Sequence, residues 1–254
     1  MNISSFFRGV IVTAEKNIKI YYKKAPVIIF GLLFPLFMFT SFFMGRNIDI
    51  SIFFPGFLAM ALFFTSSSVG PLITPWEKQA GTYERLLSFP VSIHTIILGD
   101  VLAGAIYGIL ITSPVIIIAG VLLNFPITSI MILLVSLVLG TFCFASLGVA
   151  LASPSVSSPS HIMMFSSLIR FPLIFISGIF IPLQELQGTG RILSYISPLT
   201  YLVDMFHAGL DGTSVFPVVL NILALILFTC FFLLISSYFH KQYFGKYIIN
   251  IFNL

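Results

Sequence analysis

Residues 129–152 read SIMILLVSLVLGTFCFASLGVALA and carry no charged side chain. An α-helix needs about 20 predominantly apolar residues to cross the ~30 Å hydrocarbon core of a bilayer, so this stretch predicts a membrane span. The whole chain of 254 residues has the same character, with 58% hydrophobic and 8% charged residues. Soluble domains average about 25% charged residues. The composition therefore predicts an all-α integral membrane protein and excludes a cytosolic globular enzyme, a nucleic-acid binder with a basic face and a disordered chain.

Charges and helix breakers divide the chain into six expected transmembrane helices within a single transmembrane domain. Charged residues bound the early spans, but no charge lies between Asp100 and Arg170. There the breakers Asn124-Phe125-Pro126 and the Ser/Pro-rich residues 153–160 set the boundaries. The expected spans cover residues 26–45, 51–74, 95–123, 129–152, 162–183 and 215–239.

The lysines and arginines predict the orientation, because cytoplasmic loops retain them. With both termini in the cytoplasm, the inner segments hold Arg8, Lys16, Lys19, Lys23, Lys24, Lys78, Arg85, Lys241 and Lys246. The outer segments then hold Arg46 and Arg191. We therefore expect a multi-pass protein of the cell membrane with both termini cytoplasmic.

Residues 1–25 alternate apolar and basic side chains at helical spacing. This pattern predicts an amphipathic helix that lies on the inner leaflet, held by apolar burial and by attraction to anionic lipids. The alternative is a solvated basic tail.

Residues 76–90, WEKQAGTYERLLSFP, form a short mixed-charge link between the second and third spans, closed by Pro90. A helix that carries the apolar side chains of Trp76, Tyr83 and Leu86 suits docking into a groove of a soluble partner. The alternative is a solvated loop with interfacial aromatic residues.

Two stretches carry a resemblance to a known family. Residues 77–92, EKQAGTYERLLSFPVS, resemble the Glu…Gly-Thr-x-Glu-x-Leu-x-x-x-Pro signature of type-2 ABC exporter permeases, the daunorubicin-exporter and polysaccharide-exporter class. Residues 177–182, SGIFIP, and 196–204, ISPLTYLVD, are similar to the motifs that follow the fifth span in the drug-exporter branch. The six-span layout and the leading interfacial helix match as well.

The resemblance implies a transport subunit rather than an enzyme, with no catalytic residue and no metal site. It implies two partners, a separate ABC ATPase subunit that binds ATP and Mg, and a second permease copy, all in a lipid bilayer and without nucleic acid. The chain itself is expected to bind no cofactor, because its Gly245-Lys246 pair is followed by Tyr247 rather than completing a phosphate loop. The implied ATPase-coupling residues are Glu77, Gly81, Thr82, Glu84, Arg85, Leu86, Leu87 and Pro90, and the implied residues of the translocation path or outer gate are Pro182, Pro198, Thr200, Tyr201 and Asp204.

Two charges fall within or near the expected spans. Arg170 lies well inside the fifth span and Asp100 lies near the start of the third. Because a charge in a membrane is costly and usually faces a partner or water, the two could pair, or Arg170 could face a cavity. In the alternative, Asp100 sits at the interface and Arg170 snorkels along the bundle.

Residues 184–211 are too polar and interrupted to span a membrane. The resemblance implies a pair of short re-entrant helices that cap the path before the last span, which is tolerated where protein or water covers the backbone. The alternative is an ordinary external loop.

The Gly104-x-x-x-Gly108 motif in the third span predicts close helix packing within the bundle.

The preferred function is the membrane-spanning permease subunit of an ATP-driven exporter that moves a drug, a lipid or a lipid-linked molecule. A stand-alone ion-coupled transporter or channel is the alternative, but it needs several intramembrane carboxylates and Asp100 is the candidate near the membrane. An intramembrane enzyme lacks sequence support, because neither Gly-x-Ser-x-Gly nor His-Glu-x-x-His occurs in the chain.

Overall fold

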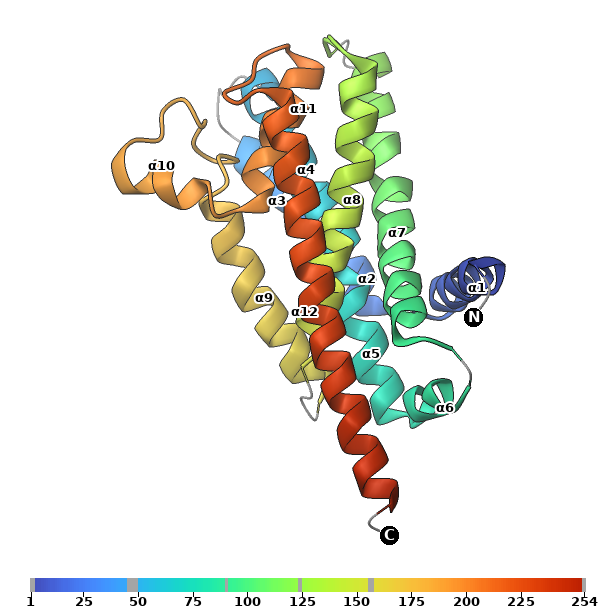
Figure 1. The fold of residues 1–254 in the computed structure, drawn as a ribbon. Coiled ribbons are helices and arrows are strands. Elements are labelled where there is room, and N and C mark those ends of the chain that lie inside the picture. The colour runs from blue at the N-terminus through green and yellow to red at the C-terminus, as the bar shows by residue number, and fades with distance from the viewer. Residues whose placement is uncertain (1–2, 45–49, 90, 123–124, 155–157, 253–254) are drawn as a thin grey trace.

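The computed structural model describes residues 3–44, 50–89, 91–122, 125–154 and 158–252. Throughout these residues the regular secondary structure is helical, as the composition predicts. Long helices run side by side in an elongated bundle, and α1 (Ile3–Tyr21) lies at its flank (Figure 1). The two ends of the chain both lie toward the lower half of the bundle in this view.

Among the described residues, five helical segments are long and apolar enough to cross a membrane. Each overlaps one of the six expected spans, and the expected span 162–183 has no counterpart among them. The five segments are Ala25–Phe43, Ile52–Gln79, Ile93–Val121, Ile130–Ala152 and Val218–Tyr243.

Prolines shape the first two of these segments without ending them. In the first, Pro35 has no N–H to donate, and the preceding turn is π-helical, with the Phe34 amide donating to Ile29 O. In the second, the helix breaks at Val69, just before Pro71. The elements are α2 (Ala25–Ile28), η1 (Ile29–Leu33), α3 (Phe34–Phe43), α4 (Ile50–Ser68) and α5 (Gly70–Gln79).

The next two spans follow the sequence prediction closely, whereas the last helix is much longer than expected. They are α7 (Ile93–Leu122) and α8 (Ile130–Ala152), and the Ser129 hydroxyl caps α8 by accepting from the Ile132 amide at 3.4 Å. The last helix, α12 (Val218–Phe252), continues past the expected end at residue 239. The expected span ends at residue 239 because His240 and Lys241 follow it, but a helix can continue in water because its backbone groups are satisfied internally.

The expected fifth span, 162–183, is represented by a shorter helix, α9 (Pro159–Phe175). Pro172 lies in its last turn and Gly178 takes a positive φ of 86°, so the chain leaves the helix before residue 183. Two further helices follow within the segment 184–211, namely α10 (Gly188–Ser194) and α11 (Pro198–Leu210).

Helix α1 packs against α7 with one of its faces. Val10, Ala14, Asn17 and Tyr21 are buried, while Ile3, Phe7, Ile11 and Val12 are exposed. Gly99 of α7 allows this approach, since a Cβ there would lie 2.5 Å from the Cβ of Thr13. Helix α1 therefore packs against the bundle with one face and exposes apolar side chains on the other.

Small residues bring α4, α7 and α8 together where α4 meets α5. A Cβ on Gly104 would lie 2.8 Å from the Ser66 carbonyl oxygen, and one on Gly108 would lie 2.0 Å from the Ser66 hydroxyl. On α8, a Cβ on Gly148 would lie 2.7 Å from the Ser67 carbonyl oxygen. These contacts confirm the packing role predicted for the Gly-x-x-x-Gly motif.

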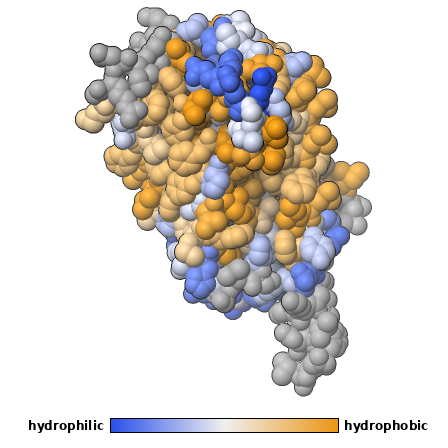
Figure 2. All heavy atoms as spheres, turned by 90° about the vertical axis from the view of Figure 1, so that its left-hand side faces the viewer, coloured by the Kyte–Doolittle hydropathy of each residue, from blue (hydrophilic) through white to orange (hydrophobic). Residues whose placement is uncertain are grey.

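The surface of the bundle is apolar over its middle. Figure 2 shows the side that carries α9 and α10, where hydrophobic residues cover the centre and hydrophilic residues gather toward the two ends. The exposed side chains on α9 include Met164, Leu168 and Phe175. A belt of this kind suits the hydrocarbon core of a bilayer, so the chain is a multi-pass membrane protein.

Candidate functional site

The link between the second and third spans is a helix–joint–helix rather than one continuous helix. Trp76–Gln79 still belong to α5, and the short helix α6 (Thr82–Ser88) follows after Ala80 and Gly81. Gly81 adopts the left-handed conformation, with φ 65° and ψ 16°, which an L-residue adopts only at a cost. The glycine of the signature therefore supplies the sharp change of direction between the two helices. Pro90 lies outside the described residues.

Glu77 faces into the protein and pairs with Lys16 of α1. Next to this ion pair, the Asn17 side-chain amide donates to Asp100 Oδ1 at 2.7 Å, and the Tyr22 hydroxyl donates to the Ala103 carbonyl at 2.6 Å. These contacts tie α1 to the end of α5 and to the beginning of α7. Asp100 is thus a buried structural contact of α1, a role that the sequence did not predict.

The inner face of α6 rests on the end of α12. The Tyr243 hydroxyl donates to Glu84 Oε1 at 2.7 Å, and the Lys78 ammonium lies 4.1 Å from the centroid of the Tyr243 ring. Tyr83 is buried beside them, with its ring centroid 5.7 Å from that of Tyr243. Burial, with the nearby carboxylates of Asp100 and Glu77, raises the pKa of Tyr83, so its hydroxyl stays protonated.

A groove of about 370 Å³ opens between α1 and the outer face of α6. We call it the α1–α6 groove, and its lining combines cations with apolar side chains. Phe89 is 61% exposed and Ile20 is 47% exposed, so hydrophobic surface is open at the end of the bundle. The residues that line the groove are Lys16, Ile20, Tyr21, Lys24, Trp76, Glu77, Ala80, Thr82, Arg85, Leu86 and Phe89.

The predicted coupling residues therefore divide between two directions. Glu84 points inward to Tyr243, whereas Thr82 and Arg85 are exposed and line the groove together with Leu86. Glu77 is buried and its ion pair with Lys16 lies in the wall of the groove. Leu87 belongs to α6, but its side chain is outside the described part of the structure. The sequence did not predict Phe89 as part of this surface, although it lies within the quoted signature.

Arg170 and Asp100 do not pair with each other. The Arg170 guanidinium donates to the carbonyl of Ser67, at the break between α4 and α5, while Asp100 accepts from Asn17. Arg170 is buried where α9 packs against α5 and α8, and it lines neither the α1–α6 groove nor the apolar pocket between the first three spans. Its role in this structure is to satisfy a main-chain oxygen.

The motif from Pro198 to Asp204, at the other end of the bundle, connects α10, α11 and the start of α12. Pro198 begins α11, the Thr200 hydroxyl donates to Ser194 O at 2.6 Å, and the Tyr201 hydroxyl donates to Tyr195 O at 2.9 Å. These bonds fix α10 against α11.

The buried Asp204 carboxylate connects α11 to the start of α12. It accepts from the amides of Val215 at 2.7 Å and Phe216 at 3.0 Å, and from the Asn221 side chain at 2.8 Å. Pro182 lies in the turns between α9 and α10, where its carbonyl accepts from the Glu185 amide at 2.9 Å. The predicted gate residues are thus brought together by α11, except Pro182.

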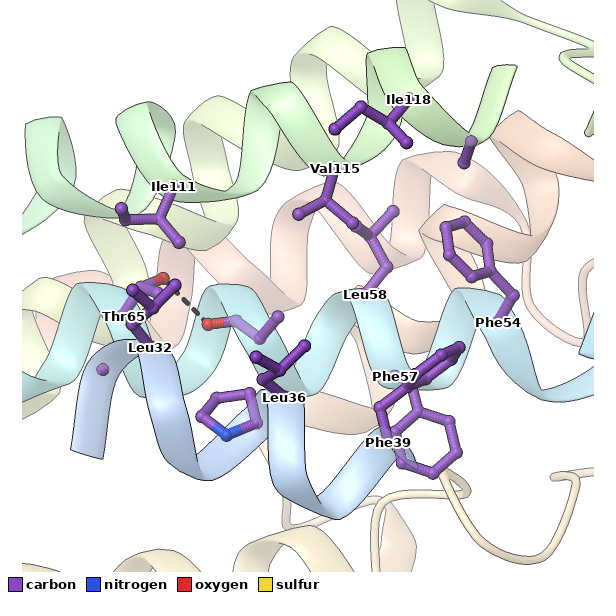
Figure 3. Close-up of a pocket in the computed structure, with 14 residues that line it drawn as sticks. Leu32, Leu36, Phe39, Phe54, Phe57, Leu58, Thr65, Ile111, Val115 and Ile118 are labelled. Atoms are coloured by element: carbon purple, nitrogen blue, oxygen red, sulfur yellow. Dashed lines mark hydrogen bonds between the residues drawn. The ribbon is translucent and has the colours of Figure 1, made fainter. Parts of the chain in front are cut away.

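An apolar pocket of about 250 Å³ lies between the first, second and third spans (Figure 3). Leu36 and Phe39 approach it from α3, Phe57 and Leu58 from α4, and Val115 from α7. Its polar member, Thr65, donates its hydroxyl to the Ala61 carbonyl of its own helix at 2.8 Å. The pocket can therefore hold an apolar group but offers that group no hydrogen bond.

Comparison with known proteins identifies the family. The model of the ABC-2 type transporter family matches residues 9–210. The chain belongs to the ABC-2 type transporter family. Its members are membrane transport subunits that work with a separate ATP-binding subunit. The resemblance drawn from the two motifs is confirmed at the level of the family.

Two relatives are transport or nodulation proteins of bacteria. The chain is 28% identical over 152 residues to the inner membrane transport permease YadH of Escherichia coli K12, which covers 60% of this chain and 59% of YadH. It is 27% identical over 144 residues to nodulation protein J of Rhizobium meliloti strain 1021, covering 57% of this chain and 55% of that protein. The match therefore spans less than two thirds of either relative.

Proposed function

We propose that this chain is the permease subunit of an ATP-driven exporter and that a separate ATPase subunit docks on α6 and the α1–α6 groove. The observation that carries the proposal is the division of α6 into two faces. Its inner face contacts Tyr243 through Glu84 and Lys78 through Tyr83, while Arg85, Leu86 and the following Phe89 line an open groove. A short helix that is held on its inner face and presents a cation beside apolar side chains on its outer face suits docking into another protein.

The transport cycle follows from this attachment. Closure of two ATPase subunits on ATP moves α6, and the spans then exchange between inward-open and outward-open states. ATP and Mg bind to the ATPase subunits, and this chain binds no cofactor. Two copies of this chain, or this chain with a paralogue, enclose the path. The apolar pocket in Figure 3 suits an apolar substrate moiety such as a lipid chain, but it does not distinguish drugs from lipids.

We also propose that α9 is the sixth crossing and that both termini are cytoplasmic. The 17 residues of α9 extend about 26 Å at ~1.5 Å per residue, close to the ~30 Å apolar core. In Figure 1, α9 rises from the lower end of the bundle toward α10, and α12 then returns to the lower end. Lys16, Lys78, Arg85 and Lys241 belong to the elements that meet there, which supports a cytoplasmic lower end in a cell or inner membrane.

In this orientation, α10 and α11 form the outer gate. Helix α11 is buried against α4, α8 and α12, which supports a re-entrant position rather than an external loop. Thr200, Tyr201 and Asp204 fix the gate through the bonds described above.

A pull-down from detergent-solubilised native membranes tests the proposal. An affinity tag at the C-terminal end of the chain should recover a soluble ATPase. Arg85→Glu should abolish that recovery, because it reverses the charge of a side chain that is exposed beside the groove. The Arg85 side chain makes no contact within the described structure that would be lost, so the fold should be kept. Arg191→Glu, an equal charge reversal on α10, should leave recovery unchanged. Equal recovery by both variants, or no ATPase with the unmodified chain, would contradict the proposal.

A further inference from the structure

Helix α12 is longer than a membrane crossing requires. Its 35 residues extend about 52 Å at ~1.5 Å per residue, compared with a hydrocarbon core of about 30 Å. The apolar segment suited to spanning ends at Tyr243. In Figure 1 the last turns of α12 pass beside α5 and α6 and continue below them. The end of α12 is therefore positioned to act on the link between the second and third spans.

Tyr243 contacts both sides of the Gly81 joint. Its hydroxyl donates to Glu84 of α6 at 2.7 Å, and its ring lies 4.1 Å from the ammonium of Lys78 on α5. The ring of Tyr83 packs on the same tyrosine at 5.7 Å. Tyr243 thus contributes to the direction of α6 relative to α5. It does so beside the Thr82 hydroxyl, which donates to Glu77 O at 3.3 Å, and the Lys78 ammonium, which lies 5.5 Å from the centroid of the Tyr83 ring.

The joint needs such a support. Helix α6 has seven residues, and isolated helices shorter than about 12 residues are marginal in water. At Gly81 a Cβ would meet no atom within 4 Å, so packing does not fix the joint at that position. The orientation of α6 must therefore come from its tertiary contacts, and the contacts of its inner face are with α5 and α12.

We infer that Tyr243 is a positioning residue for the coupling helix, so that the cytoplasmic end of α12 forms part of the coupling machinery. The inference rests on the proposed docking of an ATPase on α6. Without the Tyr243 hydroxyl, α6 still forms and still exposes Arg85, but its direction relative to α5 fluctuates. Movement of the ATPase is then transmitted less completely to the spans.

Tyr243→Phe removes the hydroxyl and keeps the ring. Tyr238→Phe is the matched control, because Tyr238 lies on the same helix and is 66% exposed. In the purified full-length chain, hydrogen exchange of the amides of residues 82–88 should be about tenfold faster in Tyr243→Phe, the order expected for one hydrogen bond to a charged group. It should be unchanged in Tyr238→Phe. Equal exchange in the two variants would overturn the inference, whether or not an ATPase binds.

In the complex with the co-purified ATPase, Tyr243→Phe should lower kcat for ATP hydrolysis about three- to tenfold. The KM for ATP and the amount of bound ATPase should stay the same. A parallel loss of bound ATPase would instead indicate a general packing defect and overturn the inference. Absence of ATPase from the unmodified chain would contradict the proposed function, and the exchange measurement would still decide the role of Tyr243.

Glu84 reports the same contact from the other side. Glu84→Gln keeps an oxygen that accepts from Tyr243, so Tyr243→Phe should still accelerate exchange in that background. Glu84→Leu removes the acceptor, and Tyr243→Phe should then add nothing. Additive effects in the Glu84→Leu background would show that Tyr243 acts through another residue. If Tyr243→Phe folds poorly, Glu84→Leu alone still decides the matter, because it removes the same hydrogen bond and should accelerate exchange of residues 82–88 while Glu84→Gln does not.

Discussion

Gly81→Ala should weaken docking of the ATPase through backbone strain alone. Gly81 has φ 65° and ψ 16°, and a Cβ at this position would lie in open space. Steric clash therefore contributes nothing, and the cost is that of an L-residue in the left-handed region, about 1–2 kcal/mol. Asparagine visits this region more readily than alanine, so Gly81→Asn should cost less.

The strain becomes a loss of affinity because α6 of the free variant relaxes out of the left-handed conformation at residue 81 and must return to it in order to dock. A cost of 1–2 kcal/mol corresponds to a factor of about 5–30 in Kd, which binding of the purified ATPase to the permease in lipid nanodiscs can resolve. The expected order of Kd is glycine, asparagine, alanine, from tightest to weakest. Gly190→Ala is the control, because Gly190 lies within the helix α10 and its Cβ would meet nothing closer than 3.7 Å. If alanine at position 81 bound as tightly as glycine, the argument from the positive φ would be refuted.

Three further substitutions test contacts inside the bundle. Arg170→Met should destabilise the purified protein by about 1–3 kcal/mol, because the Ser67 carbonyl is left unpaired in the interior, and a melting curve equal to that of the unmodified chain would contradict this role. Asp204→Ala should cost about 2–3 kcal/mol in the same assay, since two amides and an amide side chain lose their charged acceptor, whereas an unchanged melting temperature would show that α11 is held by other contacts. Asn17→Leu should accelerate amide exchange across residues 3–21 by releasing α1 from α7, and unchanged protection would mean that apolar packing alone holds that helix.

The family and the spans that follow clear apolar runs were predictable from sequence. Runs such as 129–152 carry enough information by length and composition to identify a crossing, and the structure reproduces this one as α8. The boundaries were less predictable. Helix α9 ends eight residues early because Pro172 and Gly178 interrupt it, although residues 176–183 remain apolar.

The direction of each coupling side chain could not be predicted. Glu77 and Glu84 belong to one signature, and both were assigned to docking from the resemblance. Their partners are Lys16 and Tyr243, which lie 61 and 159 positions away along the chain. Periodicity describes the face of a helix and cannot say which distant residue covers it. Asn17 did leave a signal, because it continues the buried stripe of Val10, Ala14 and Tyr21 at helical spacing.

Arg170 shows how a local rule could have led to the right partner. A charge inside an apolar segment was expected to find an acidic residue or a water-filled cavity, and Asp100 was the candidate because it lies near the start of the third span. The second span, however, contains Pro71, which has no N–H to donate to the carbonyl four residues earlier, that of Ser67. A main-chain oxygen without a donor is costly inside a membrane, so a neighbouring helix must supply one. The guanidinium of Arg170 does so. A proline in one span can therefore leave a carbonyl without a donor, and an arginine in another span can donate to that carbonyl. No acidic residue is then required to explain the arginine.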